Sequence, residues 1–176
     1  MKILLDENQV RDGVARMAGE ITRVYGQQPL TIVAVMTGSV VLLADLIRLL
    51  SMPLRVGVLQ ASSYRGNTRR GALTINADLM PAVAGRDVLL IDDIFDTGHT
   101  LAQVVSLVQE LGPRSVRSSV LLCKMGRQEV EYRPDFVALE IPDEFVVGYG
   151  LDYQDAYRNL PYIATLDEDD IARTLP

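Results

Sequence analysis

The spacing of apolar residues changes along the chain, and each spacing predicts a different element. In residues 10–24 apolar side chains recur every three or four positions, which is typical of one face of an α-helix ending near Gly26. The positions that define this face are Val10, Val14, Met17, Ile21 and Val24. Residues 30–36 form instead a continuous apolar run rich in β-branched side chains, which predicts a strand buried on both faces.

Further segments of both kinds follow in alternation. Helices are predicted at residues 40–50 and 100–112, where the apolar spacing is again helical. Strands are predicted at residues 54–64, 72–78, 87–92, 115–123, 136–141 and 145–149. This alternation predicts an α/β fold with a mostly parallel sheet flanked by helices on both faces. Residues 1–176 are expected to form a single domain, with the acidic segment 166–176 as a solvated end.

Composition and charge exclude several classes of protein. With 176 residues, of which 48% are hydrophobic and 23% charged, the chain can bury one globular core. Its net charge of −6 disfavours binding along nucleic acid, which requires a basic surface. The single cysteine, Cys123, excludes an internal disulfide and is expected to be a buried thiol.

No targeting or membrane segment is expected. The apolar stretch within the first nine residues, MKILLDENQ, is too short for a signal peptide. The longest apolar region, residues 32–44, is interrupted by Thr37, Gly38 and Ser39 and is shorter than the roughly 20 residues that a membrane helix needs. We therefore expect a cytoplasmic protein with no membrane and no nucleic-acid partner.

The stretch VLLIDDIFDTGHTL, residues 88–101, carries the strongest chemical signal. Its second half opens a predicted helix, so the backbone N–H groups there have no intrahelical partner and favour an anion such as phosphate. This candidate phosphate loop comprises Asp96, Thr97, Gly98, His99 and Thr100. An ordinary Asp/Thr helix cap after a strand is the alternative interpretation, and it remains open from the sequence.

Three acids precede or begin this loop, and they suit the hydroxyl groups of a sugar. Asp92 and Asp93, at a strand end, could bind vicinal ribose hydroxyls directly or through a hard cation such as Mg²⁺. Asp96 could take a proton from an incoming nitrogen nucleophile. Aspartyl phosphatases and receiver domains also place acids at strand ends, but their acids come early in the chain and with a different spacing.

These residues resemble the 5-phosphoribosyl-1-pyrophosphate (PRPP) motif of type I phosphoribosyltransferases. The stretches VAVMTGSVVLLADLIR, SSYRGNTRRG and PDFVALEIPDEFVVGYGLDYQDAYRNLPYI narrow the resemblance to hypoxanthine-guanine phosphoribosyltransferases. It extends from about residue 10 to residue 166. The resemblance implies the type I phosphoribosyltransferase fold, with a small C-terminal hood formed mainly by residues 125–176 together with the N-terminal segment.

The resemblance also implies the reaction. A purine base attacks C1′ of PRPP, pyrophosphate leaves, and IMP or GMP forms from hypoxanthine or guanine with Mg²⁺ as cofactor, a step of purine salvage. Asp96 would be the catalytic acid/base group that faces purine N7. Asp92 and Asp93 would bind the ribose and, with Asp152, the metal.

On the base side, the resemblance assigns Lys124 to the purine 6-oxo group, Phe145 to stacking, Val146 to backbone contacts with the base edge, and Asp152 to its 2-position edge. A lysine ammonium can only donate hydrogen bonds, so it suits a carbonyl and not the amino group of adenine. Considered alone, these residues have ordinary interpretations as a solvated lysine, a core aromatic and a turn aspartate.

On the pyrophosphate side, the implied residues are Thr37, Gly38, Ser39 and Arg158. The resemblance implies that this loop contacts pyrophosphate through backbone N–H groups. Many family members have lysine where this chain has Thr37, so a direct cationic contact from the loop is not expected here. The family often has a cis peptide bond at the position of Met36–Thr37. A lid that closes over the reaction would begin at Ser63 and Tyr64. The ring of His99 is expected at the surface.

Two alternative functions remain. One is a regulator on the same fold that binds RNA or DNA, which the acidic charge disfavours. The other is transfer to adenine, xanthine or uracil. The resemblance further implies a homodimer or homotetramer.

Overall fold

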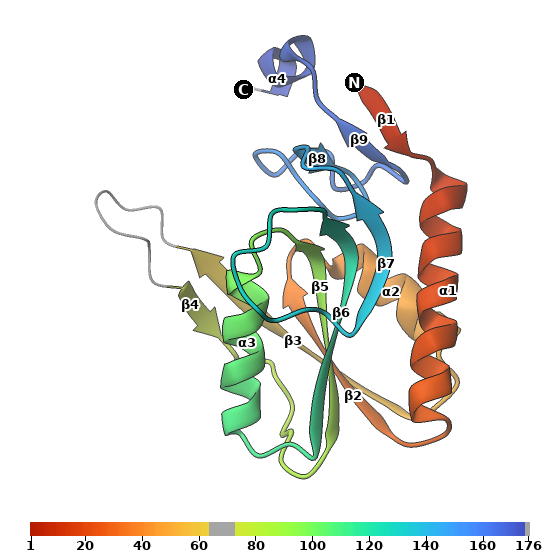
Figure 1. The fold of residues 1–176 in the computed structure, drawn as a ribbon, viewed down its shortest axis with the longest axis vertical. Coiled ribbons are helices and arrows are strands. Elements are labelled where there is room, and N and C mark those ends of the chain that lie inside the picture. The colour runs from red at the N-terminus through yellow and green to blue at the C-terminus, as the bar shows by residue number, and fades with distance from the viewer. Residues whose placement is uncertain (64–72, 175–176) are drawn as a thin grey trace.

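A six-stranded sheet forms the centre of the molecule (Figure 1). The computed structural model describes residues 1–63 and 73–174. The strands are β2 (Leu30–Met36), β3 (Leu54–Ser63), β4 (Leu73–Asn76), β5 (Asp87–Phe95), β6 (Ser115–Lys124) and β7 (Phe136–Ile141). Their order is β4-β3-β2-β5-β6-β7, and all neighbouring pairs are parallel except β3 and β4. The predicted α/β fold with a mostly parallel sheet is confirmed.

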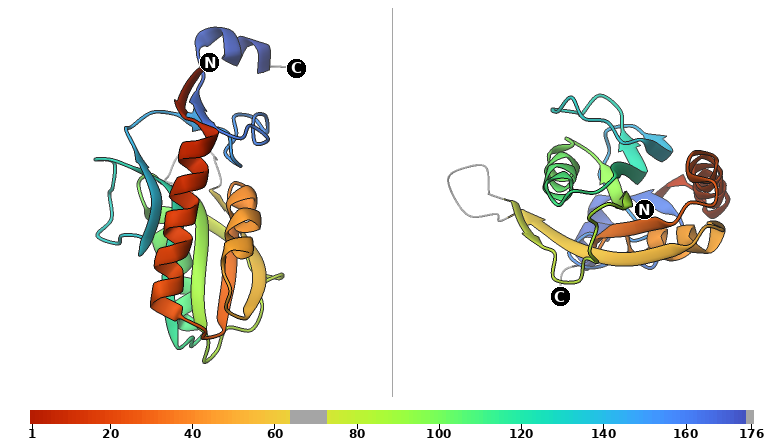
Figure 2. Two further views of the ribbon diagram at one scale, coloured as in Figure 1. Left: turned by 90° about the vertical axis from the view of Figure 1, so that its right-hand side faces the viewer. Right: turned by 90° about the horizontal axis from the view of Figure 1, so that it is seen from below.

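Helices cover both faces of this sheet (Figures 1 and 2). Helices α1 (Glu7–Tyr25) and α2 (Val40–Leu49) pack on one face, and α3 (His99–Glu110) packs on the other. A capping box between Asp6 and Gln9 begins α1, where each side chain accepts a hydrogen bond from the other residue's backbone N–H. The prediction that Val24 belongs to the buried face is wrong: its side chain is exposed, and the last turn buries Tyr25 instead.

The two cores meet across β2, as expected for a strand in the middle of a parallel sheet. Ile32 and Ala34 pack toward α1 and α2, while Val33 and Val35 pack toward α3. All four side chains are buried, so the prediction of a strand covered on both faces is confirmed.

A separate small sheet lies above the carboxyl ends of the main strands (Figure 1). It contains β1 (Lys2–Leu5), β9 (Ile163–Thr165) and β8 (Val146–Val147) in that order. The apolar spacing predicts neither β1 nor β9, and β8 is shorter than the predicted strand 145–149. β7 falls within the predicted hood range of 125–176, but it pairs with β6 in the main sheet.

The acidic end of the chain also has regular structure. Residues predicted only as a solvated end include helix α4 (Glu168–Thr174), whose first turn carries three acids. Within the part of the chain that the structure describes, no helix is both long and apolar enough to cross a membrane.

Candidate active site

A cavity of about 400 Å³ opens at the carboxyl edge of the main sheet. The ends of β2 and β5, the start of α3, and the segment between β8 and β9 contribute its walls. The predicted site residues that line it are Thr37, Gly38, Asp92, Asp93, Asp96, Thr97, Gly98, Thr100, Asp152 and Arg158. Parallel strands bring these residues together because their carboxyl ends share one edge of the sheet.

The predicted phosphate loop begins α3 without an ordinary helix cap. Gly98 is the N-cap residue with φ of +90°, and no side chain forms a capping hydrogen bond. A Cβ atom here would lie 2.5 Å from Val130 Cγ2 and 2.7 Å from Phe95 Cζ, so the position has no room for a larger residue. The N–H groups of the first turn are therefore available to an anion at the positive end of the helix dipole.

Two adjacent acids lie on the other wall of the cavity. Asp92 is buried, and its Oδ1 accepts a hydrogen bond from the Asp93 backbone N–H at 3.0 Å. Burial raises the pKa of Asp92 well above its ordinary value, and the charge of Asp93 adds to this effect. Burial also raises the pKa of Asp93, although backbone N–H donors and the nearby Arg158 act in the opposite direction. A cation or sugar hydroxyls would stabilise the charged form of both groups.

The loop after β2 packs directly against this acid pair. The Met36–Thr37 peptide bond is cis, as the resemblance implied. A Cβ atom on Gly38 would lie 1.6 Å from Asp93 Oδ2, so only glycine fits beside that carboxylate. Ser39 is buried and donates its hydroxyl to the Val35 carbonyl at 2.5 Å, which leaves its backbone as the part that could serve a ligand.

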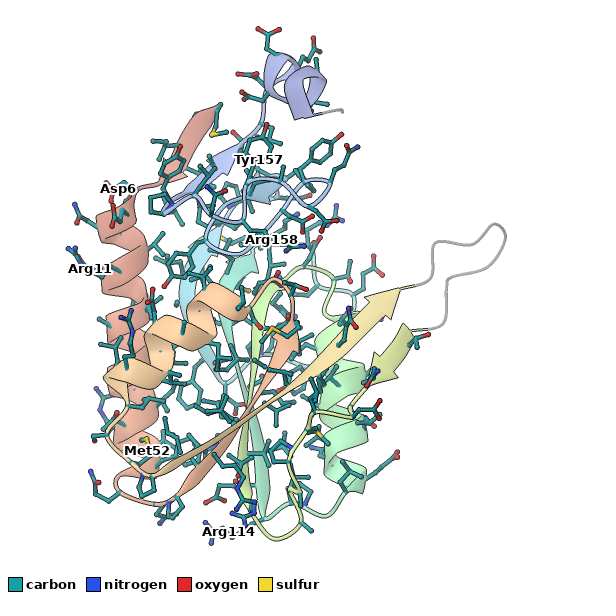
Figure 3. The ribbon with its side chains drawn as sticks, turned by 180° about the vertical axis from the view of Figure 1, so that it is seen from behind. Asp6, Arg11, Met52, Arg114, Tyr157 and Arg158 are labelled. Carbon is teal, nitrogen blue, oxygen red and sulfur yellow. The ribbon has the colours of Figure 1, made fainter. Side chains whose placement is uncertain are left out.

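Arg158 lies between the small sheet and the main sheet, where Figure 3 labels it. Its guanidinium donates to the Gly150 carbonyl at 2.8 Å and pairs with Asp152 Oδ1 at 2.8 Å and with Asp155 Oδ1 at 3.2 Å. Asp152 thus faces a cation rather than the acid pair. Within residues 1–63 and 73–174, no three His, Cys, Asp or Glu side chains gather into a metal site.

Lys124 ends β6 next to the cavity but does not line it. Its side chain is only 10% exposed, and Nζ lies 3.4 Å from Asp96 Oδ2 and 3.5 Å from Asp143 Oδ1. The interpretation of Lys124 as an ordinary solvated lysine is therefore wrong. Sequence reasoning missed Asp143 and also Arg127, which donates from Nε to Asp96 Oδ1 at 3.0 Å. The sequence feature that could have indicated both residues is their position, because Arg127 closely follows the end of β6 and Asp143 closely follows the end of β7.

The remaining predicted residues lie around the cavity rather than in its wall. Phe145 is 58% exposed and contacts Tyr153 edge to face, with ring centroids 5.8 Å apart, so it is not a core residue. Val146 is buried in β8. The His99 ring is exposed, as expected, and its Nε2 lies 2.9 Å from Glu129 Oε2.

Two further predictions concern the lid and the cysteine. Ser63 is the last residue of β3, whereas Tyr64 and the rest of the predicted lid lie outside the described residues. Cys123, expected to be a buried thiol, is partly exposed, although burial still raises the pKa of its thiol.

Comparisons with known proteins agree on the family. Residues 1–154 match the phosphoribosyl transferase domain family. A hypoxanthine-guanine phosphoribosyltransferase from Staphylococcus epidermidis is 41% identical over 165 residues, which cover 93% of this chain and 92% of the relative.

Solved structures are similar over nearly the whole chain. A hypoxanthine-guanine phosphoribosyltransferase from Bacillus anthracis, with a HEPES molecule in the active site, superposes with a TM-score of 0.89 at 33% identity, covering 95% of this chain and 99% of that one. A hypoxanthine phosphoribosyltransferase from Staphylococcus aureus gives 0.89 at 37% identity, covering 96% and 92%. The fold, the matched domain and the sequence identity together show that this chain belongs to the phosphoribosyltransferase family, among its hypoxanthine-guanine phosphoribosyltransferases.

Proposed function

We propose that the protein transfers the 5-phosphoribosyl group of PRPP to hypoxanthine or guanine in purine salvage. Nitrogen N9 of the purine forms a bond to C1′, and the C1′–O bond to pyrophosphate breaks with its electron pair leaving on oxygen. The proton on purine N7 passes to the protein. The products are IMP or GMP and pyrophosphate.

The arrangement of one cavity carries this proposal. Along its wall stand the free N–H groups at the start of α3, the buried pair Asp92 and Asp93, and Arg158 with the loop after β2. These groups match, in order, a 5′-phosphate, the ribose hydroxyls and a pyrophosphate. A simple phosphate-binding protein would not need the two acids.

Each residue then has a definite task. Thr97, Gly98, His99 and Thr100 hold the 5′-phosphate through the helix N-terminus. Asp96, the first residue of the phosphate loop, accepts the N7 proton, because its Oδ2 lies 3.4 Å from the Lys124 ammonium that would meet the 6-oxo group of the same base. Lys124 donates to the 6-oxo group, Phe145 stacks on the base, and Val146 and Asp152 meet the base edge.

The charge distribution of the cavity suits Mg²⁺. Burial disfavours the charged forms of Asp92 and Asp93, and the charge of Asp93 adds to this effect at Asp92. A divalent cation would reverse the effect at both groups. Mg²⁺ in such sites commonly takes one or two carboxylates and completes its shell with substrate oxygens and water. When bound, it would neutralise charge on the leaving pyrophosphate. Asp152 could join it only after parting from Arg158.

A single assay panel tests the proposal. The purified protein is incubated with PRPP and hypoxanthine, guanine, xanthine, adenine or uracil, with and without Mg²⁺, and nucleotide formation is followed. We expect IMP and GMP to form only with Mg²⁺, and adenine and uracil to give far less product. Equal use of adenine, or no transfer to any base, would refute the proposal.

Two further measurements address the alternatives. Filter binding with RNA at moderate salt should show no tight retention, whereas tight retention would favour the regulator. Light scattering after gel filtration should give the mass of a dimer or tetramer rather than the 19.4 kDa chain. We place the enzyme in the cytoplasm, because its phosphorylated substrate does not cross membranes.

A further inference from the structure

Four charged side chains form a closed ring beside the cavity. Asp96 pairs with Lys124 at 3.4 Å and with Arg127 at 3.0 Å. Asp143 pairs with the same two cations, at 3.5 Å from Lys124 and 3.3 Å from Arg127. This charged ring, made of Asp96, Lys124, Asp143 and Arg127, holds two anions and two cations in alternation.

The main sheet and one tight turn bring the ring together. Lys124, the last residue of β6, is in register with Ile141 at the end of β7, so Asp143 follows close by. After Lys124 the chain turns at Gly126, whose φ is +74°, and returns Arg127 toward Asp96. The Met125 N–H donates to the Ile141 carbonyl at 2.9 Å and fixes this turn against β7.

Within the ring, the two oxygens of Asp96 have different partners. Oδ1 accepts from Arg127 Nε, and Oδ2 faces the Lys124 ammonium. When a 6-oxopurine binds, Lys124 must turn to the carbonyl of the base, which frees Oδ2 and leaves Oδ1 held. The oxygen that remains held by Arg127 fixes the orientation of the whole carboxylate.

Resting on the proposed function, we infer that Arg127 is a positioning residue that presents Asp96 Oδ2 to the purine N7 proton. The planar guanidinium suits this task because Nε and Nη1 reach two different carboxylates, Asp96 and Asp143. Asp143 in turn anchors the guanidinium and gives Lys124 a second anionic partner.

Removal of Arg127 should weaken catalysis for a specific reason. Asp96 would then have Lys124 as its remaining cationic partner in the ring, and the two would pair more closely. That pairing would hold the carboxylate away from N7 and the ammonium away from the 6-oxo group. Misplacement of a reacting group by about 1 Å costs about 100-fold in rate.

The test is a double-mutant cycle between Arg127→Gln and Asp96→Asn, measured as kcat and KM for both substrates. Arg133→Gln is the matched control, since Arg133 lies in the same loop but donates to the Val130 and Tyr132 carbonyls instead. Arg127→Gln should lower kcat by about 10- to 100-fold, with the KM for PRPP changed by less than about threefold. In the Asp96→Asn background the same change should cost less than about twofold.

The outcomes separate the inference from the function on which it rests. Equal losses from Arg127→Gln in both backgrounds, or a loss no larger than that of Arg133→Gln, would overturn the positioning role. Arg127→Lys keeps the positive charge but lacks the planar guanidinium that reaches two carboxylates. It should therefore retain only part of the wild-type kcat, and a kcat equal to wild type would also overturn the positioning role. A wild-type protein that forms no nucleotide would instead overturn the proposed function, and with it the inference.

Discussion

The contact between Gly38 and Asp93 allows a sharp test of how the cavity is built. A Cβ on Gly38 would stand 1.6 Å from Asp93 Oδ2, whereas such contacts do not fall below 3.0 Å. Gly38→Ala therefore forces these groups apart by about 1.4 Å. Asp93 cannot simply rotate away at no cost, because its Oδ1 accepts a hydrogen bond from the Ile94 N–H at 2.7 Å.

The size of the effect follows from that displacement. Since a shift of about 1 Å costs about 100-fold, Gly38→Ala should lower kcat/KM for PRPP by about 100-fold or more. Overpacking of this kind costs about 1–3 kcal/mol of folding free energy. For a chain of this length that corresponds to a fall in Tm of about 2–12 °C.

Gly19→Ala is the matched control, because Gly19 lies in α1 with nothing within 4 Å of the added Cβ. It should raise the free energy of unfolding by about 0.5–1 kcal/mol and leave kinetics unchanged. Steady-state kinetics with varied PRPP and a thermal melt of each variant complete the experiment. If Gly38→Ala keeps kcat/KM within about threefold of wild type, the proposed role of Asp93 at the ribose is wrong.

Three other substitutions probe the remaining parts of the site. Asp96→Asn should cut kcat by about 10²- to 10⁴-fold while titration calorimetry still detects PRPP binding, and an unchanged kcat would remove Asp96 from the proton transfer. Lys124→Ala should lower the ratio of hypoxanthine to adenine use by at least about tenfold in competition assays, and a constant ratio would contradict the specificity argument. Asp92→Asn should raise the KM for PRPP. Because burial and Asp93 raise the pKa of Asp92 above 3.8, its favourable contribution to stability is present at low pH and is lost as the pH rises through the raised value. Asp92→Asn should therefore raise the Tm of the substrate-free protein more at about pH 8 than at about pH 5, and the opposite order would refute the burial argument.

The sequence alone is sufficient to predict the part of the site whose residues lie in one continuous stretch. Asp92 and Thr100 are eight positions apart, and the rule that the ends of parallel strands share one edge of the sheet predicts that they lie together. The same rule brings Lys124 to that edge. Apolar runs and short-range periodicity likewise predict each strand of the main sheet and three helices.

What sequence cannot predict depends on register and on distant pairing. The contact between Arg127 and Asp96 requires both the alignment of β6 with β7 and the turn at Gly126, and neither leaves a periodic signal. The pairing of Arg158 with Asp152 arises in an irregular segment and redirects a predicted metal ligand toward a cation. Strands β1 and β9 are short, and their sequences, KILL and IAT, show no alternation of apolar and polar residues.

The pairing of Lys2 with Thr165 has a consequence for biosynthesis. At ribosomal speeds of about 5–20 residues per second, β1 is synthesised roughly ten to thirty seconds before its partner strand β9. The stretch that contains the aspartates and the start of α3 leaves the exit tunnel well before β9 does. A nascent chain can thus assemble the cavity wall formed by Asp92, Asp93 and the start of α3 during translation, while the small sheet, which contains Val146 and adjoins Phe145, closes only after β9 has emerged.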